Sequence, residues 1–218
     1  KRRHKLFLAR DRSGIKPLYY FKKGDLLVFG SEVKTILKHP EVKTGINLES
    51  LNFYFYQGYM PRKDSVFEGI YKLLPGYSLT FSKAGLKPKK FFELPQVDLG
   101  DGRSVENLDS LIENSVVGQS IADVPLGVFL SGGTDSSLVS YYLSRRTKKL
   151  KSFSISFKEK SFDESRYARQ VASFLGTEHH SDFFDAKDVL ESFSEICGKI
   201  DEPFFDPSIF PTFKVCKF

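Results

Sequence analysis

The chain has 218 residues, of which 40% are hydrophobic and 28% charged, so it is long enough for one or two domains with self-supporting cores. This composition excludes intrinsically disordered and collagen-like chains. The 33 basic residues exceed the 27 acidic ones only mildly, and the resulting net charge of +6 fits a phosphorylated small molecule as well as nucleic acid.

The sequence also lacks the patterns of membrane and exported proteins. No apolar run approaches the roughly 18 residues that cross a bilayer, and the first residues, KRRHKLFLARD, become charged again too soon for a signal peptide. The two cysteines, Cys197 and Cys216, have no CxxC spacing and indicate reduced thiols. We therefore expect a cytoplasmic protein with no membrane partner.

The first hundred residues predict mainly strands. Residues 5–10, 15–21 and 25–31 read as short strands separated by turn-forming residues, which predicts an antiparallel meander. Residues 72–94 predict a closing hairpin, and the polar, Gly- and Pro-containing residues 94–104 are typical of a linker. A domain boundary is therefore expected near residue 100.

Two helices are expected within this first part. The first is short, with Ser31 as its cap and Pro40 ending it. The second runs from about Asn47 to Gly58 and carries a run of aromatic residues that we interpret as core rather than as a base-stacking platform. These aromatic residues are Phe53, Tyr54, Phe55 and Tyr56.

Beyond residue 100 the pattern changes to alternating strands and helices. Strands are predicted at 125–130, 151–157 and 179–184, and helices at 136–146 and 163–176. Alternation at this spacing predicts a parallel sheet with right-handed crossovers. The second domain is therefore expected to have the doubly wound α/β arrangement.

The segment SGGTDSS, residues 131–137, lies between a predicted strand and a predicted helix. A loop at the carboxyl end of a parallel strand is where open α/β sheets bind ligands, and the following helix presents unpaired N–H groups that attract phosphate. Gly132 and Gly133 permit positive φ angles, while Ser131, Ser136 and Ser137 offer hydroxyl donors. The pattern predicts a phosphate-binding loop.

Asp135 within this loop repels phosphate, so we expect it to bind Mg²⁺ or to cap the helix. The structural alternative for the whole segment is a serine-glycine turn that only caps a helix. The loop lacks GxxxxGK[ST] and GxGxxG, which disfavours Walker-type phosphoryl transfer and dinucleotide binding.

The residues DVPLGVFLSGGTDSSLVS, 123–140, resemble the ATP pyrophosphatase loop of the glutamine-hydrolysing asparagine synthetase family. The segments at 153–157, 162–165 and 168–184 resemble that family's next α/β unit, and DEPFFDPSIFPTF, 201–213, resembles a segment that approaches its acyl-adenylate site. In the first half, the segments similar to the end of the family's class II glutaminase domain and its connection are 10–20, 29–37 and 58–79.

This resemblance implies a fold and a division of the chain. Residues 1–98 would be the C-terminal part of an antiparallel, β-rich glutaminase domain of the Ntn type. Residues 99–218 would be the first half of a doubly wound, parallel-sheet ATP pyrophosphatase domain, similar to adenine nucleotide alpha-hydrolases. The implied overall class is α/β.

The resemblance also implies a two-step synthesis of an amide. A carboxylate, aspartate in this family, is adenylated by ATP with release of pyrophosphate, and ammonia from glutamine then attacks the acyl-adenylate. The implied cofactors are ATP and Mg²⁺, and the implied partners are the small molecules ATP, aspartate and glutamine, without nucleic acid; a homodimer is left open. Magnesium, helix-end N–H groups and hydroxyls would stabilise the leaving pyrophosphate.

The resemblance assigns roles to individual residues. The pyrophosphate loop corresponds to Ser131, Gly132, Gly133, Asp135 and Ser136, with Asp135 as the implied Mg²⁺ ligand. Two further positions, Leu130 and Ile155, match residues that line the family's adenine pocket. From the sequence pattern alone, a core-packing role for Ile155 is at least as good an interpretation, since Phe153, Ile155 and Phe157 alternate onto one apolar face.

Two features of the family are missing. The chain starts at Lys1 rather than at the nucleophilic cysteine of a class II glutaminase, and it ends at Phe218 before a second pyrophosphate signature, SGEGxDE. We therefore expect an internal piece of a longer protein that by itself neither hydrolyses glutamine nor forms an amide, with no catalytic residue of the glutaminase reaction present.

Other polar residues have open interpretations. The adjacent His179 and His180 point to opposite faces of a strand and favour structural roles. The acidic residues Asp201, Glu202 and Asp206 either bind Mg²⁺, position an acceptor substrate or are simply solvated. For the whole protein, the alternatives are a related amidotransferase acting on another carboxylate and a nucleotide-binding remnant without catalysis.

Overall fold

A computed structural model describes residues 5–60, 63–94 and 107–218. The chain divides into two compact units, the first formed by Lys1–Val97 with Cys197–Asp206 and the second by Asp98–Ile196 with Pro207–Phe218. The linker expected near residue 100 lies largely outside the described residues. Residues 197–206, expected in the second domain, instead cluster with the first unit.

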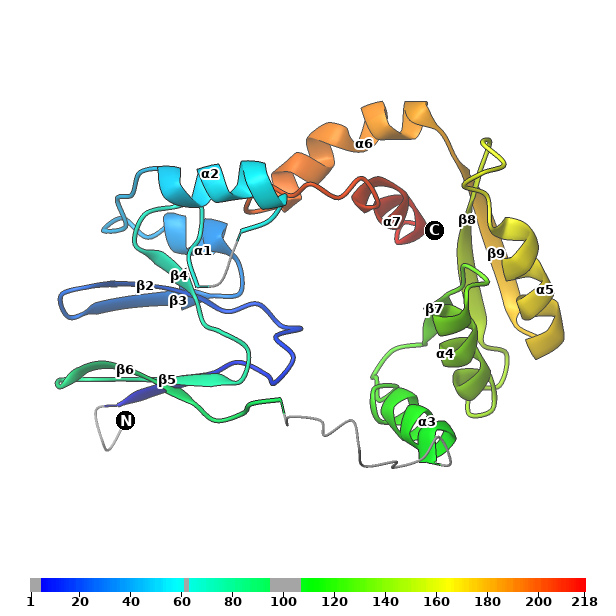
Figure 1. The fold of residues 1–218 in the computed structure, drawn as a ribbon, viewed down its shortest axis with the longest axis horizontal. Helices are drawn as coiled ribbons and strands as arrows, with labels where there is room; N and C mark the ends of the chain where they lie inside the picture. Colours follow the sequence, from blue (N-terminus) through cyan, green and yellow to red (C-terminus); the bar gives the residue numbers. More distant parts are fainter. Residues whose placement is uncertain (1–4, 61–62, 95–106) are drawn as a thin grey trace. The chain divides into compact units, whose positions relative to one another are not determined.

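The first unit contains two antiparallel sheets of three strands each (Figure 1). One sheet has the order β1-β5-β6, with β1 at Leu6–Ala9, β5 at Tyr77–Ser82 and β6 at Gly85–Lys90. The other has the order β3-β2-β4, with β3 at Leu26–Gly30, β2 at Tyr19–Lys23 and β4 at Ile70–Lys72. The hairpins predicted for β2 with β3 and for β5 with β6 are therefore both present.

The predicted meander is wrong for its first strand, since β1 pairs with β5 rather than with β2. The turn after β1 explains the change of sheet. The guanidinium group of Arg10 donates hydrogen bonds to the carbonyl oxygens of Gly14, Lys16 and Leu73, and the carboxylate of Asp11 accepts the N–H groups of Ile15 and Lys16. These bonds fix a closed loop that redirects the chain before β2 begins.

Helix α2, Leu48–Gln57, has the boundaries that the sequence predicts. The side chain of Asn47 accepts the N–H of Ser50, and Gly58 ends the helix in the left-handed conformation at φ 79°. The expectation that its aromatic residues form core is wrong for most of them, because the exposed fractions are 40% for Phe53, 76% for Phe55 and 85% for Tyr56.

Helix α1, Val33–Leu37, packs on β2 and β3 and supplies much of the first unit's core. The core cluster consists of Phe21, Val33, Ile36, Val42 and Ile70. Ser31 is not its cap as expected: Glu32 stands at the cap position without a side-chain bond, and the N–H of Val33 donates to Asp201 instead. The cap of this helix is therefore supplied by a residue distant in sequence.

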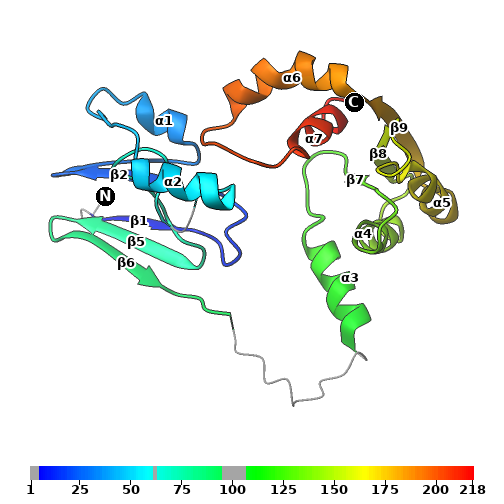
Figure 2. The same ribbon diagram turned by 45° about the horizontal axis from the view of Figure 1, so that its top comes forward.

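The second unit contains a parallel sheet with the order β7-β8-β9. Its strands are Gly127–Phe129, Lys151–Phe157 and Glu178–Phe184. Helices α4, Thr134–Ser144, and α5, Ser165–Leu175, contact the strands from one side, and α7, Ile209–Val215, contacts β8 and β9 from the other (Figure 2). The alternation of strands and helices and the parallel pairing agree with the sequence prediction.

Besides α7, two more helices of the second unit have no counterpart in that prediction. Helix α6 spans Ala186–Lys199, and helix α3 spans Leu108–Gly118. Helix α3 packs on α4, where the carboxylate of Asp109 accepts the hydroxyl of Tyr142 and raises the pKa of that tyrosine to about 12. The strand β7 is also shorter than the six residues predicted for it and lies at one edge of the three strands described.

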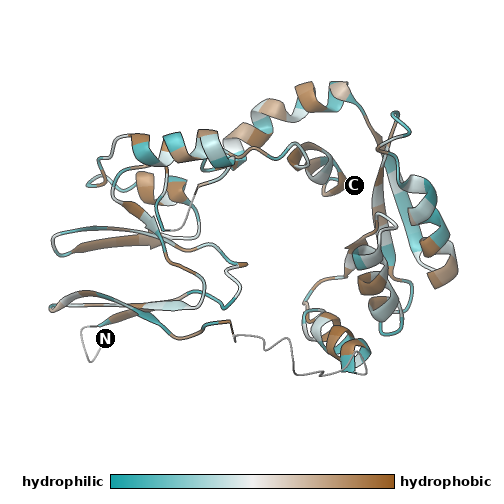
Figure 3. Cartoon of the chain, viewed as in Figure 1, coloured by the Kyte–Doolittle hydropathy of each residue, from teal (hydrophilic) through white to brown (hydrophobic). Residues whose placement is uncertain are grey.

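The hydropathy of each helix follows its packing. Much of α5 is hydrophilic in Figure 3, and only the small side chains of Ser165, Ala168 and Ala172 are buried from it. Small residues let α5 approach the sheet closely, as the loop described below requires. Among the described helices, none is long and apolar enough to cross a membrane.

Candidate nucleotide site

The loop SGGTDSS joins the carboxyl end of β7 to the first turn of α4, as the sequence predicts. Ser131 and Gly132 follow the strand, Gly133 is the N-cap of α4, and Thr134 begins the helix. The N–H groups of the first helical turn have no acceptors within the helix, and the helix dipole gives this end a partial positive charge. The arrangement suits the binding of an anion.

Gly132 is held tightly between the loop and α5. Its φ angle is 86°, and a Cβ atom built on it would lie 2.5 Å from both the backbone nitrogen of Ala168 and the Cβ of Tyr167. Contacts this short with another helix exclude every side chain. Of the two glycines that permit positive φ, only Gly132 uses this freedom, since Gly133 has a φ of −72° at the start of the helix.

The hydroxyls of Ser131 and Ser136 form hydrogen bonds within the loop. Oγ of Ser136 accepts the N–H of Ser131, lies 3.0 Å from Oγ of Ser131 and donates to the carbonyl of Gly133. Oγ of Ser131 in turn accepts the N–H of Gly133 at 3.2 Å. Ser137 is different, since its hydroxyl is buried and finds no partner in the described part of the chain. Ser131 and Ser136 are therefore the hydroxyls that the loop holds in a defined place.

Asp135 is the second residue of α4, and its side chain is exposed. It is therefore not the helix cap, one of the two roles expected for it; the other, as a Mg²⁺ ligand, stays a prediction. Mg²⁺ in proteins is commonly held by one or two carboxylates together with substrate phosphates, so a single exposed carboxylate beside an anion-binding turn fits it. Within the described residues, no cluster of three or more metal-ligating side chains exists.

A cavity of about 250 Å³ opens beside the loop within the second unit. Its walls include Leu130 and Ser131 from the loop and Ile155 from β8. Leu130 is 1% exposed and also packs against Ala168. It therefore both packs in the core and lines the cavity. The cavity walls are mainly apolar, which suits a flat heterocycle more than a second anion.

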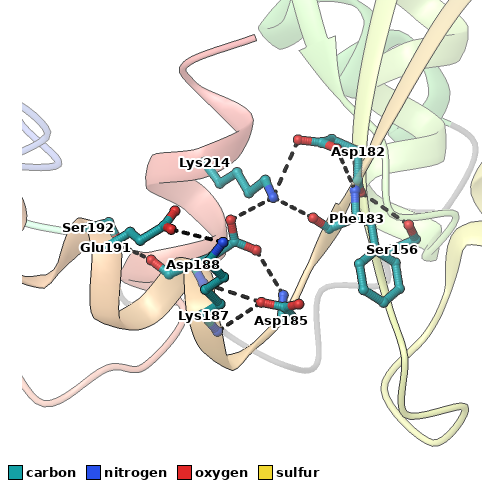
Figure 4. A network of polar contacts seen from close by, with 9 residues as sticks. All are labelled: Ser156, Asp182, Phe183, Asp185, Lys187, Asp188, Glu191, Ser192 and Lys214. Atoms are coloured by element: carbon teal, nitrogen blue, oxygen red, sulfur yellow. Dashed lines mark hydrogen bonds and ion pairs between the residues drawn. The ribbon is translucent and has the colours of Figure 1, made fainter.

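Helix α7 forms a further wall of this cavity through Pro211, Thr212 and Val215. The ammonium group of Lys214, on the same helix, contacts carboxylate oxygens of Asp188 at 2.7 Å and Asp182 at 3.5 Å and donates to the carbonyl oxygen of Phe183 (Figure 4). Because Asp182 and Phe183 lie on β9 and Asp188 lies on α6, one side chain fastens three elements. Lys214 therefore fixes a cavity wall although it does not line the cavity.

Lys214→Met is expected to destabilise the second unit by about 1–2 kcal/mol, since it removes a partly buried charged hydrogen bond. The bond to Lys214 lowers the pKa of Asp188 below 3.8, so its stabilising effect is present at neutral pH and is lost in acid. The melting temperature should therefore decrease less steeply between pH 7 and pH 3 in the variant than in the unsubstituted protein. Lys217→Met, which removes a more exposed lysine of the same region, is the matched control and should change little.

The two histidines of β9 have separate structural partners. The ring of His179 lies within hydrogen-bond distance of the hydroxyls of Ser152 and Ser154, and burial, together with Arg169 and His180, lowers its pKa. The ring of His180 instead stacks on Phe153 and contacts Glu178. Among the residues that the structure describes, the two rings share no partner, which agrees with the interpretation from the strand pattern.

Comparison with known proteins identifies the families that the two parts of the chain match. Residues 107–218 match the family described as Asparagine synthase, and residues 1–92 match the Glutamine amidotransferase domain. The loop, the cavity and the parallel sheet all lie in the first of these matches.

Individual relatives extend over nearly the whole chain. A putative glutamine-hydrolysing asparagine synthetase 2 of Methanocaldococcus jannaschii is 35% identical over 99% of this chain and 43% of its own length. Asparagine synthetase 3 of Bacillus subtilis is 33% identical over 89% of this chain and 35% of its own length. A third relative, the amidase chry2 of Gibberella zeae, is 29% identical over 94% of this chain and 33% of its own length. The chain thus spans less than half the length of these relatives.

Proposed function

Because this chain belongs to the asparagine synthase family, we propose that it is part of an enzyme that uses ATP to convert a carboxylate into an amide with glutamine as the nitrogen donor. The activity is proposed for a protein of the relatives' full length that carries this chain, called the full-length protein below. The supporting observation is the loop that joins β7 to α4 beside a mainly apolar cavity, with Gly132 pressed against α5.

We propose that the loop binds the pyrophosphate end of ATP. The residues involved are Ser131, Gly132, Gly133, Asp135 and Ser136. The first-turn N–H groups of α4 would donate to phosphate oxygens, and the two serine hydroxyls would exchange their present partners for phosphate oxygens, as charge develops on the leaving group. Mg²⁺, held by Asp135 and the phosphates, would neutralise part of that charge.

We propose that the cavity receives the adenine ring, with Leu130 and Ile155 against its faces. The substrate carboxylate then attacks the α-phosphorus, the bond between that phosphorus and the bridging oxygen breaks, and pyrophosphate leaves. Ammonia attacks the carbonyl carbon of the acyl-adenylate, and AMP leaves as the amide forms. The protein's contribution to the first step is to hold the triphosphate in line for attack.

The finer fold assignments belong to the same proposal. Residues 1–98 would be the end of an Ntn-type glutaminase domain and residues 99–218 the beginning of a doubly wound ATP pyrophosphatase domain, apart from the segment 197–206. A cytoplasmic location is part of the proposal, supported by the free thiols of Cys197 and Cys216. A homodimer is an arrangement that sedimentation of the full-length protein would test.

A panel of carboxylic acids tests the acceptor. We expect the full-length protein to release pyrophosphate from ATP in the presence of aspartate, and to release little with glutamate, β-alanine or a small peptide acid. A second candidate, an amidotransferase for another carboxylate, is favoured by the similarity to a protein named as an amidase rather than an asparagine synthetase. Pyrophosphate release that is faster with any other acid than with aspartate would support that candidate and contradict the first.

A further inference from the structure

Residues 197–206 connect elements of the second unit but are bound within the first. The chain enters the first unit in the last turn of α6 and leaves it after Asp206, just before α7 begins at Ile209. This segment carries Asp201 and Glu202, the adjacent carboxylates for which the sequence left Mg²⁺ binding, acceptor binding and simple solvation open. We call these two residues the carboxylate anchor.

Glu202 has three hydrogen-bond donors from the first unit. Its Oε2 accepts the hydroxyl of Tyr19 at 3.1 Å and lies 2.9 Å from the ammonium nitrogen of Lys72, while its Oε1 accepts the backbone N–H of Val66 at 3.0 Å. The carboxylate side chain is only 10% exposed and Lys72 15%. Burial and the negative charge of Glu202 raise the pKa of Tyr19 well above its ordinary value, which keeps the phenol protonated as a donor.

Asp201 is fixed in the same way. Its Oδ2 accepts the N–H of Val33 at 2.5 Å, and its Oδ1 lies 3.6 Å from the ammonium nitrogen of Lys34, which also donates to the carbonyl oxygen of Lys199. Four residues after Asp201, the N–H of Phe205 donates to the carbonyl oxygen of Gly58. Both carboxylate side chains are largely buried, at 12% and 10% exposure, and both are engaged by groups of the protein.

The two ends of the anchored segment continue into the elements that Lys214 fastens. Before it, α6 carries Asp188, and after it, α7 carries Thr212 and Val215, which line the cavity. Only six residues separate Glu202, which is bound within the first unit, from Ile209, where α7 begins.

From these contacts we propose that Asp201 and Glu202 are positioning residues that bind the α6–α7 connection to the glutaminase unit and thereby restrain the cavity wall formed by α7. They act on neither metal nor acceptor directly. The identity of the cavity as an ATP site rests on the proposed function, whereas the anchor itself does not.

Amide hydrogen exchange of the 218-residue chain tests the anchor without any ligand. In Glu202→Gln, the amide NH₂ cannot accept a bond where a donor points at it, so we expect exchange at least about tenfold faster in residues 64–73 and 197–206 and also in α7. Glu93→Gln is the matched control, since it removes a 76% exposed carboxylate of the first unit that is paired with nearby Lys90.

Three results would overturn the proposal. Unchanged exchange at Val66 would contradict the anchor, and faster exchange at Val66 without any change in α7 would contradict the restraint of the cavity wall. Protection of residues 201–202 by Mg²⁺ alone would indicate a metal ligand instead. Should Glu202→Gln fail to fold, Tyr19→Phe removes one donor and should give the same pattern more weakly. In addition, Lys72→Arg keeps the ion pair with Glu202 and should leave the amide protection mostly intact, whereas Lys72→Met should reduce it.

In the full-length protein, the same anchor should affect coupling between the two reactions. We expect Glu202→Gln to raise two quantities at least about threefold, the Michaelis constant for ATP and the number of glutamate molecules formed for each amide made. Glutamine hydrolysis in the absence of ATP should be unchanged. An unchanged ratio and Michaelis constant would contradict the restraint. A full-length protein that forms no AMP would refute the proposed function, while the exchange experiment would still decide the anchor.

Discussion

Asp135→Ala in the full-length protein is expected to lower carboxylate-dependent pyrophosphate release by at least about a hundredfold, the scale found when one group that stabilises a leaving charge is removed. Asp135 is exposed on the first turn of α4, so the substitution leaves no cavity and removes no packing. Glutamine hydrolysis should remain, because the glutaminase reaction uses other residues.

The control for this variant is Asp123→Ala, which removes an exposed carboxylate from the same unit outside the loop. Asp135→Asn separates charge from shape, and it should be nearly as inactive as alanine if the carboxylate holds Mg²⁺ with the phosphates. Amide synthesis that survives in both Asp135 variants would show that this carboxylate has no part in adenylation.

Gly132→Ala should strongly destabilise the second unit. The new Cβ would lie 2.5 Å from the backbone nitrogen of Ala168, and the φ angle of 86° is unfavourable for alanine. Together these costs are about 3 kcal/mol or more. We expect a lower melting temperature for the second unit and loss of ATP binding by the full-length protein.

The neighbouring glycine supplies the matched control. A Cβ at Gly133 would meet only Oγ of Ser131 at 3.3 Å, and its φ of −72° suits any residue. Gly133→Ala should therefore cost about 1 kcal/mol or less, mainly from the weaker N-cap preference of alanine. Equal effects of the two substitutions would show that the close approach of α5 does not determine the loop.

Local patterns predicted the elements on which the loop depends. The apolar runs and 3.6-residue periods gave β8, α4 and α5, and Gly176 ends α5 at φ 66°, because these signals depend on a few neighbouring residues. The pairing of β1 with β5 was beyond such signals, since it depends on the three hydrogen bonds that Arg10 makes to backbone carbonyls.

The position and chemistry of the loop residues were predicted from the sequence, but the different structural roles of the individual residues were not. Two adjacent glycines look alike in a sequence, and only the position of α5 distinguishes Gly132 from Gly133. For a related reason, Lys214 was not singled out from the sequence, and the contacts of Asp201 and Glu202 were not predicted although both residues were noted. Each acts across long sequence separations, 136 residues from Glu202 to Val66, and no local pattern marks a surface-type residue that has a distant partner.

The bond that breaks in ATP tests the central claim most directly. With ATP labelled at the α-phosphate, the full-length protein, aspartate, glutamine and Mg²⁺, we expect labelled AMP and unlabelled pyrophosphate in equal amounts, because the loop beside β7 would hold the leaving pyrophosphate. Labelled ADP with inorganic phosphate would contradict the account, as would AMP formation that persists undiminished in Gly132→Ala after that variant is shown to be folded.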